Sequence, residues 1–190
     1  MTNVKTYLLA MAMFLLSALA LFSTSPVASA TLSKHQQLVY NQEVSTYWVQ
    51  ANATKKLSIK QAKTIVNLAY ERANKLKLDP TLVLAIIKVE SGFNKEATSS
   101  SGAIGLMQIM PLYHHKAIGK RNAYREDVSI DVGSKVLKDC YQRTRNNTKA
   151  ALNCYSGGGG PQYTSKVLAY HKSANRYIQP TSNSVLIAKM

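Results

Sequence analysis

The sequence predicts an all-α protein, and two observations carry that prediction. Apolar residues recur at spacings of three and four along most of the 190-residue chain, which places them on single helix faces. No stretch of useful length alternates between apolar and polar residues, as a half-buried strand would. We therefore expect one helical domain over residues 58–175. A segment of less definite pattern, residues 31–57, precedes it, and a tail at 176–190 follows.

The first 30 residues have the pattern of a secretory signal peptide. Lys5 precedes an apolar run from Tyr7 to Phe22, and Ala28–Ser29–Ala30 has the small residues of a cleavage site. An uncleaved membrane anchor is the alternative, because a run of this length approaches what is needed to span a bilayer. The small-residue site favours cleavage after Ala30, which predicts a periplasmic or secreted protein.

The chain is strongly basic, with 24 Lys and Arg against 9 Asp and Glu and a net charge of +15. Such a charge attracts polyanions: nucleic acid, anionic lipid or an acidic polymer. The basic residues are scattered, and neither zinc-ligand spacing nor an aromatic RNA-binding signature accompanies them. For an exported protein we therefore expect an acidic extracellular polymer as partner, and no nucleic acid.

Local signals mark the first helices in order. Residues 31–56 are polar with scattered aromatic residues and fit one helix. Ser58 and Gln61 form a capping-box pattern, which predicts that the next helix begins there. Its apolar face consists of Ala62, Ile65, Val66, Ala69, Ala73 and Leu76. Asp79–Pro80 predicts an N-cap followed by proline at the first helical position, and the apolar run Leu82–Ile87 predicts a buried central helix.

Glycine and proline interrupt the pattern in the second half. Gly92 and residues 98–102 predict a loop, and Pro111 ends a Gly-interrupted apolar stretch. Two more helices are expected from Asp127 and from Thr148, and the last one from Tyr163 to His171.

Two cysteines flank the predicted turn at Asn146–Asn147. Cys140 and Cys154 lie at similar distances on either side of it, so in an antiparallel helix hairpin they could face one another. Export would permit a disulfide bond between them. Two buried reduced thiols are the alternative.

Glu90 is the candidate catalytic residue. On a helix that begins at Pro80, Val83, Ile87 and Glu90 follow at spacings of four and three and share a face. A carboxyl group against an apolar wall has a raised pKa and can hold a proton near neutral pH, as a general acid must. The alternative is a helix-end glutamate that reaches water, although a carboxylate there is unfavourable for the helix dipole.

Several residue types surround Glu90 in a fixed register. They are E-S-G-F at Glu90–Phe93, A-x-S at Ala97–Ser99, G-A-x-G-L-M-Q at Gly102–Gln108, and then Met110–Pro111. In this register the segment resembles the signature of the soluble lytic transglycosylase family, a goose-lysozyme-like group of peptidoglycan-cleaving enzymes. Downstream, "ALNCYSGGGG" resembles the family's A-Y-N-A-G segment and "YTSKVLAYHK" its closing Y-x-x-x-V helix.

The sequence departs from this pattern at two positions. Ser156 and Ser129 stand where the family usually has asparagine. Each keeps a polar group but shortens its reach, which affects the hydrogen bonds expected around the sugar more than the reaction itself.

The resemblance implies a lysozyme-like α domain with at most a minimal β element, and lytic transglycosylase activity. Such an enzyme cleaves the β-1,4 bond between N-acetylmuramic acid and N-acetylglucosamine and leaves 1,6-anhydro ends. It implies Glu90 as the sole acid and base, with no metal and no cofactor. Substrate binding falls to Ser99, Gln108, Met110 and Tyr155, with the Tyr155 hydroxyl near Glu90.

Other functions remain open. A peptidoglycan hydrolase, that is a lysozyme, would need a second carboxylate, for which Glu96 is the first candidate. Asp131 and Asp139 are expected on the polar side of their helix. A non-catalytic cell-wall-binding or assembly protein is the third possibility. The expected partner is peptidoglycan, and a cell-envelope secretion or conjugation machine is a second candidate partner.

Overall fold

The computed structural model describes residues 32–178. The predicted signal peptide and all but the first three residues of the predicted tail therefore lie outside the described residues. Within the described part the chain forms seven helices and no strand, with isolated β-bridges from Ile104 to Thr98 and to Ile109. The all-α prediction is confirmed. None of the helices described is both long and apolar enough to cross a membrane.

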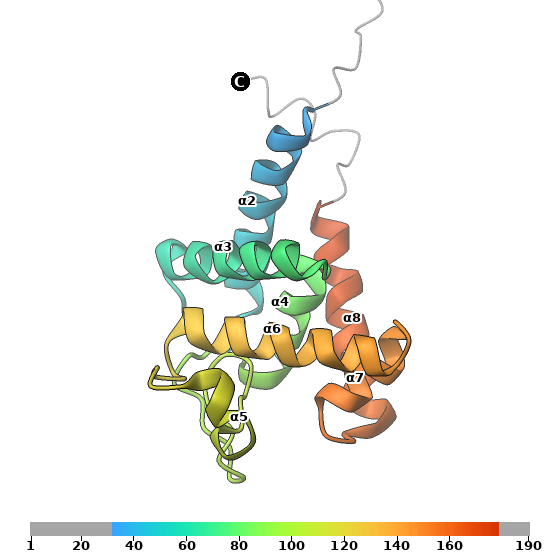
Figure 1. The fold of residues 1–190 in the computed structure, drawn as a ribbon. Helices are drawn as coiled ribbons and strands as arrows, with labels where there is room; N and C mark the ends of the chain where they lie inside the picture. Colours follow the sequence, from blue (N-terminus) through green and yellow to red (C-terminus); the bar gives the residue numbers. More distant parts are fainter. Residues whose placement is uncertain (1–31, 179–190) are drawn as a thin grey trace, which may run out of the picture. The chain divides into compact units, whose positions relative to one another are not determined.

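The helices pack as two crossing sets. α3 and α6 lie side by side and cross the steeper α4 and α8, while α5 and α7 both lie on one side of α6 (Figure 1). Their bounds are α2 Lys34–Asn52, α3 Ile59–Leu76, α4 Pro80–Ser91, α5 Pro111–Ile118, α6 Glu126–Arg143, α7 Thr148–Tyr155 and α8 Gly160–Ile178. The end of α4 thus lies close to the loop that leads to α5, which is where the candidate site forms.

The predicted helix starts are present with their caps. The Ser58 hydroxyl accepts a hydrogen bond from the Gln61 backbone N–H, and the Gln61 side chain accepts one from the Ser58 backbone N–H. The Asp79 carboxylate accepts a hydrogen bond from the Thr81 backbone N–H, with Pro80 at the first helical position. These bonds satisfy N–H groups that have no partner within the helix.

Glycine ends α4 at a position where a side chain would not fit. Gly92 has a φ of +58°, and a Cβ atom there would collide with the Thr54 side chain. The Thr54 hydroxyl and backbone N–H both donate hydrogen bonds to the Gly92 carbonyl. The chain can therefore turn sharply one residue after Ser91 and two residues after Glu90.

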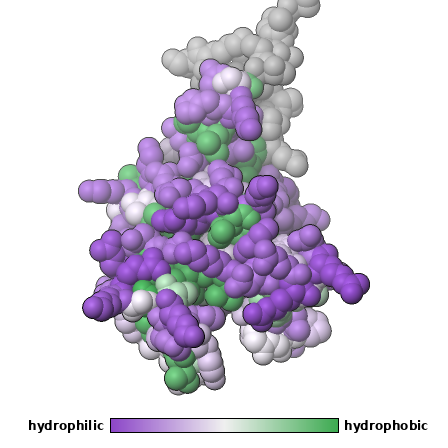
Figure 2. Space-filling model, in the orientation of Figure 1, coloured by the Kyte–Doolittle hydropathy of each residue, from purple (hydrophilic) through white to green (hydrophobic). Residues whose placement is uncertain are grey.

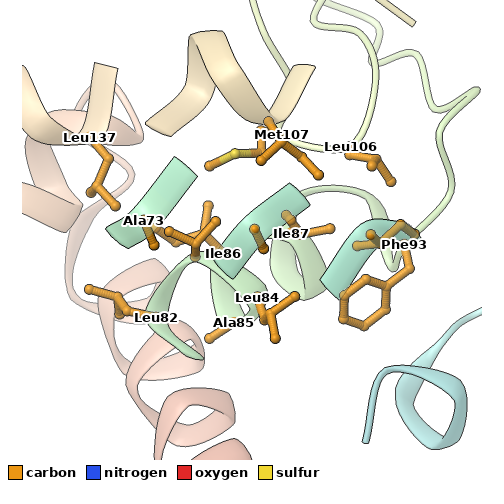
Figure 3. Packing of buried hydrophobic residues seen from close by; sticks show 14 of the residues in the cluster. Ala73, Leu82, Leu84, Ala85, Ile86, Ile87, Phe93, Leu106, Met107 and Leu137 are labelled. Carbon is orange, nitrogen blue, oxygen red and sulfur yellow. The ribbon is translucent and has the colours of Figure 1, made fainter. Parts of the chain in front are cut away.

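The hydrophobic core surrounds α4. Every residue from Leu82 to Ile87 is at most 3% exposed. Figure 3 shows Met107 and Leu106 of the following loop packed over this helix, with Ala73 of α3 and Leu137 of α6 beside them. The apolar run of α4 is thus covered by neighbouring elements, as a central buried helix requires.

α2 contributes two fully buried side chains to this core. Trp48 and Val49 are 0% exposed, and the Trp48 ring packs edge-on against Phe93 at a centroid distance of 6.0 Å. The Trp48 indole N–H also donates a hydrogen bond to the Ser173 hydroxyl of α8. The polar sequence of residues 31–56 predicts a helix, but it does not predict that two side chains of this helix are buried in the core.

Two helices differ from the sequence prediction. α5 was not predicted, since Pro111 was interpreted only as an end, whereas here it occupies the first helical position, where proline loses no hydrogen bond. α8 runs from Gly160 to Ile178 and so extends beyond the predicted Tyr163–His171 at both ends.

Candidate active site

A groove of about 710 Å³ opens beside the end of α4. Its walls come from α5, α6 and α7, and the loop between α4 and α5 completes it. All the predicted catalytic and substrate-binding residues line it: Glu90, Ser99, Gln108, Met110 and Tyr155.

Glu90 is held by a single tyrosine at the edge of this groove. The Tyr163 hydroxyl donates a hydrogen bond to Glu90 Oε1 at 2.6 Å. The other oxygen, Oε2, has no hydrogen-bond partner among the described residues. Burial raises the pKa of the Glu90 carboxyl, while the hydrogen bond from Tyr163 opposes that rise in part. The raised pKa agrees with the prediction from the apolar helix face.

The Tyr155 hydroxyl is predicted to lie near Glu90 and orient it, but the residue that donates a hydrogen bond to Glu90 is Tyr163. The Tyr155 hydroxyl points elsewhere and donates to the Met107 carbonyl at 2.8 Å. Burial, together with the nearby Glu90 charge, raises the pKa of both phenols, so both remain neutral donors. Tyr163 was visible in the sequence only as the first residue of the closing helix, with nothing that indicated its contact.

Internal hydrogen bonds shape the loop on the other side of Glu90. The Gln108 side-chain nitrogen Nε2 donates to the Ala97 and Gly105 carbonyls at 3.2 and 3.1 Å. The Ser99 hydroxyl accepts a hydrogen bond from the Ala103 backbone N–H at 3.0 Å. Ser99 and Gln108 therefore help to fold the loop that lines the groove, in addition to any contact with a ligand.

Ser129, one of the two departures from the family pattern, is part of this support. It is fully buried, and its hydroxyl accepts a hydrogen bond from the Met107 backbone N–H at 3.0 Å. A Cβ atom on Gly105, whose φ is +78°, would lie 2.7 Å from the Ala123 carbonyl and 2.9 Å from the Ser129 hydroxyl. The loop thus rests directly on α6, and the short serine leaves room for that approach.

Ser156, the other departure, fixes the turn between α7 and α8. Its hydroxyl donates to the Asn153 carbonyl and accepts a hydrogen bond from the Gly159 backbone N–H. Ser156 and the following Gly157 both line the groove. The turn that follows Tyr155 is therefore held by this serine itself.

A disulfide bond forms part of the groove wall. Cys140 of α6 and Cys154 of α7 are joined, and both line the groove. Because Cys154 immediately precedes Tyr155, the bond fixes α7 against α6 next to the site.

The acidic residues are distributed differently from the prediction. Asp139 lines the same groove, so Glu90 is not its only acid. Glu96, the predicted second carboxylate of a hydrolase, does not line it and belongs to a smaller polar pocket with Tyr124 and Arg125.

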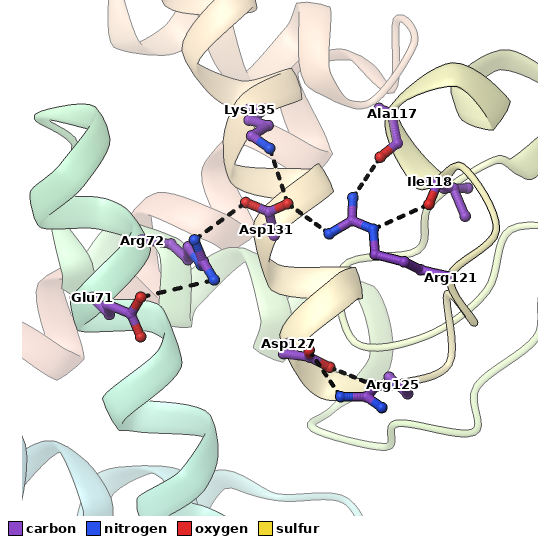
Figure 4. Close-up of polar contacts among 9 residues, drawn as sticks. All are labelled: Glu71, Arg72, Ala117, Ile118, Arg121, Arg125, Asp127, Asp131 and Lys135. Atoms are coloured by element: carbon purple, nitrogen blue, oxygen red, sulfur yellow. Dashed lines mark hydrogen bonds and ion pairs between the residues drawn. The ribbon is translucent and has the colours of Figure 1, made fainter.

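Asp131, which is predicted on the polar side of its helix, is buried instead. Asp131 is 5% exposed, and its carboxylate lies within 3.6 Å of Arg72, 3.1 Å of Arg121 and 2.9 Å of Lys135 (Figure 4). Burial alone would raise the pKa of Asp131, but hydrogen bonds from Lys135 and Arg121 lower it, so the carboxylate stays charged. Three cations offset the cost of burying it, which a single helical pattern could not show.

No group of three or more possible metal ligands occurs among residues 32–178.

Comparison with known proteins gives one family. The model of the transglycosylase SLT domain matches residues 67–178. A transglycosylase of Enterobacteria phage PRD1 is 40% identical over 81 residues, which is 43% of this chain and 30% of that protein. The membrane-bound lytic murein transglycosylase C of Actinobacillus pleuropneumoniae serotype 5b is 30% identical over 129 residues, 59% of this chain and 35% of that protein.

The solved structure of the 70 kDa soluble lytic transglycosylase from Escherichia coli superimposes with a TM-score of 0.47 at 21% identity. The match covers 83% of this chain and 29% of that one. The chain spans about a third of the length of the curated relatives it matches. The family model covers more than half of the chain and includes Glu90 and Tyr163. This chain therefore belongs to the transglycosylase SLT domain family.

Proposed function

We propose that this protein is a lytic transglycosylase that cleaves the glycan strands of peptidoglycan. The bond cut is the β-1,4 bond from N-acetylmuramic acid to N-acetylglucosamine, and the product carries a 1,6-anhydro end. The observation that carries the proposal is the Glu90–Tyr163 pair beside the groove, in a chain whose relatives are named as lytic murein transglycosylases.

Glu90 acts first as an acid and then as a base. Its carboxyl proton passes to the glycosidic oxygen while the bond from that oxygen to C1 of the muramic sugar breaks. The ionised Glu90 then takes the proton from the 6-hydroxyl of the same sugar as O6 bonds to C1. The proton on Glu90 is restored, and no water is consumed.

The surroundings of Glu90 suit both steps. Burial raises its pKa and so favours the protonated acid, whereas the Tyr163 hydrogen bond stabilises the carboxylate formed after proton transfer. Because Tyr163 engages Oε1, the proton to be transferred resides on Oε2, the oxygen without a partner among the described residues.

The remaining groove residues bind the glycan in this proposal. Gln108 donates its hydrogen bonds to the Ala97 and Gly105 carbonyls through Nε2, so its carbonyl Oε1 is the atom offered to a sugar hydroxyl. Ser99 steadies the N-acetyl group or the positive charge that develops at C1. Met110 lines the groove against the sugar rings, and Tyr155 holds the loop through the Met107 carbonyl.

Hydrolysis of the same bond is the rival reaction, because Asp139 shares the groove with Glu90. The mass of the products decides between the two. Digestion of purified sacculi should give muropeptides lighter by one water than the reducing-end forms, and products that all carry free reducing ends would contradict the proposal.

Glu90→Gln is the companion variant. It should lower the rate at which sacculi are cleared by a factor of about 10² to 10⁴, the usual contribution of a positioned acid or base. Binding to sacculi should persist in the variant. A wild-type protein that binds sacculi but never clears them would instead indicate a non-catalytic wall-binding protein.

We further propose that the protein works in the cell envelope, in the periplasm or after secretion. The net charge of +15 favours contact with the acidic wall, and several relatives are named as membrane-bound. A secretion or conjugation machine that must open the wall locally is a fitting partner. Co-purification from cross-linked envelopes tests that association.

A further inference from the structure

The groove carries a row of alternating charges along one helix. Lys135, Asp139 and Arg143 follow at spacings of four on α6, and all three line the groove that contains Glu90. We refer to these three residues as the α6 charge row. We propose that the α6 charge row binds the peptide stem that hangs from the muramic sugar of the substrate. The inference rests on the proposed function and adds the part of the substrate that the enzyme selects.

The last two members of the row, Asp139 and Arg143, are available to a ligand. Asp139 and Arg143 are exposed, and neither side chain has a hydrogen bond or ion pair to another residue in the described part of the chain. Lys135 is more constrained, because its Nζ lies 2.9 Å from the Asp131 carboxylate. Its side chain is nevertheless 52% exposed, so it keeps donors that face solvent.

Asp127 and Glu71 are acids outside the groove that do pair with a neighbouring arginine. Asp127 pairs with Arg125 at 3.0 Å, and Glu71 lies 3.7 Å from Arg72. Asp139 has basic neighbours one turn away on either side and pairs with neither of them at contact distance. In a chain with 24 Lys and Arg against 9 Asp and Glu, an unpaired acid in the groove is a specific feature.

The surface between these charges is apolar. Val132 and Val136 line the groove on the same helix, and the Cys140–Cys154 disulfide adjoins them. Figure 2 shows that the visible face of the molecule is mainly hydrophilic, so charge alone does not distinguish the row. What distinguishes it is a set of charges placed around an apolar strip inside a groove.

A peptide stem has the matching chemistry. The stem is joined to the lactyl group of the same sugar whose C1 is attacked, so a sugar placed at Glu90 brings its stem into the groove. Stem peptides have free carboxylates and, where a diamino acid is present, an ammonium group. Arg143 can bind a carboxylate through two parallel hydrogen bonds, and Asp139 can accept hydrogen bonds from an ammonium group.

Comparison of two substrates tests the proposal. Glycan strands that carry stems, and strands whose stems have been removed by an amidase, are digested in parallel and their anhydro products are quantified. The wild type should have a kcat/KM higher on the stem-bearing strands by about tenfold, the size expected for a charge-assisted hydrogen bond. Arg143→Gln should reduce that ratio toward one. Lys149→Gln, which removes an exposed charge of α7 outside the groove, should leave the ratio as in the wild type.

A binding measurement separates this inference from the proposed reaction. An N-acetylmuramyl peptide with free carboxylates is titrated into the Glu90→Gln protein by calorimetry, together with the same compound with its carboxylates amidated. In the Glu90→Gln protein, the added substitution Arg143→Gln should weaken binding of the peptide with free carboxylates about tenfold. It should weaken binding of the amidated peptide much less. Equal effects on both compounds, or an unchanged substrate ratio in Arg143→Gln, would overturn the inference. Absence of anhydro products from the wild type would overturn the proposed function, while the titration would still decide the role of the row.

Discussion

The Tyr163 hydroxyl lies 2.6 Å from Glu90 Oε1, although the two residues are 73 positions apart in the sequence. The contact joins the last turn of α4 to the first turns of α8. The same two helices are also joined at the other end of α4, where the Thr81 hydroxyl bonds to Asn175 and His171 lies 2.8 Å from the Asp79 carboxylate. Contacts at both ends of α4 fix how α8 lies along it. They therefore also fix the position of the Tyr163 hydroxyl relative to Glu90.

Removal of the Tyr163 hydroxyl should shift the pH profile. Tyr163 lowers the pKa of Glu90 against the effect of burial, so in Tyr163→Phe that pKa rises further. Since the reaction starts from the protonated acid, the decline in activity at high pH should move to higher pH. Rates on sacculi from pH 4 to 9 measure the shift. Tyr155→Phe is the matched control, because its hydroxyl bonds to the Met107 carbonyl, and its high-pH decline should stay in place.

Glu90→Gln should not lower the stability of the folded protein near neutral pH. The folded-state pKa of Glu90 is raised, so this group favours folding below its unfolded pKa, and that contribution is lost as pH rises through the folded value. The glutamine variant and the wild type should therefore unfold alike near pH 4, and the variant should be the more stable at pH 7 to 8. Thermal unfolding at several pH values measures this. A variant that is less stable at pH 8 than the wild type would count against the buried carboxyl.

Loss of the disulfide should destabilise the protein more than it alters the chemistry. Cys140 and Cys154 are 14 positions apart, and a bond that closes such a loop contributes about 3 kcal/mol to the free energy of unfolding. The double variant to serine should show that loss in urea unfolding, and a reducing agent should destabilise only the wild type. Equal sensitivity of both proteins to the reductant would mean that the bond contributes nothing.

The charge on Asp131 should matter for stability far more than that on Asp127. Asp131→Asn leaves three cations around a buried neutral amide, and such a change costs about 3 kcal/mol or more. Asp127→Asn removes an exposed ion pair with Arg125, which contributes little to stability because solvent screens it. Urea unfolding of both variants compares the two costs. Equal losses would show that burial of Asp131 adds nothing to its ion pairs.

The amino-acid sequence determined the features that depend on near neighbours. The caps at Ser58 and Asp79, the apolar run of α4 and the face that Glu90 shares with Ile87 follow from spacings of two to four residues. A repeated local pattern of this kind is visible in the sequence because residues three and four apart on a helix are neighbours. The resemblance to the soluble lytic transglycosylase family, rather than helical spacing, named Ser99, Gln108, Met110 and Tyr155, and all four line the groove.

Only the tertiary structure decided which distant residues meet. The partner of Glu90 is Tyr163, the burial of Asp131 depends on Arg72 of another helix, and Asp139 reaches the groove through the packing of α6 against α7. Each of these arrangements depends on the packing of different helices and leaves no periodic pattern in the sequence of either helix. Helix packing therefore determines which residues contact Glu90 and change its pKa. The position of Glu90 on the apolar face of α4 follows from the sequence of that helix alone.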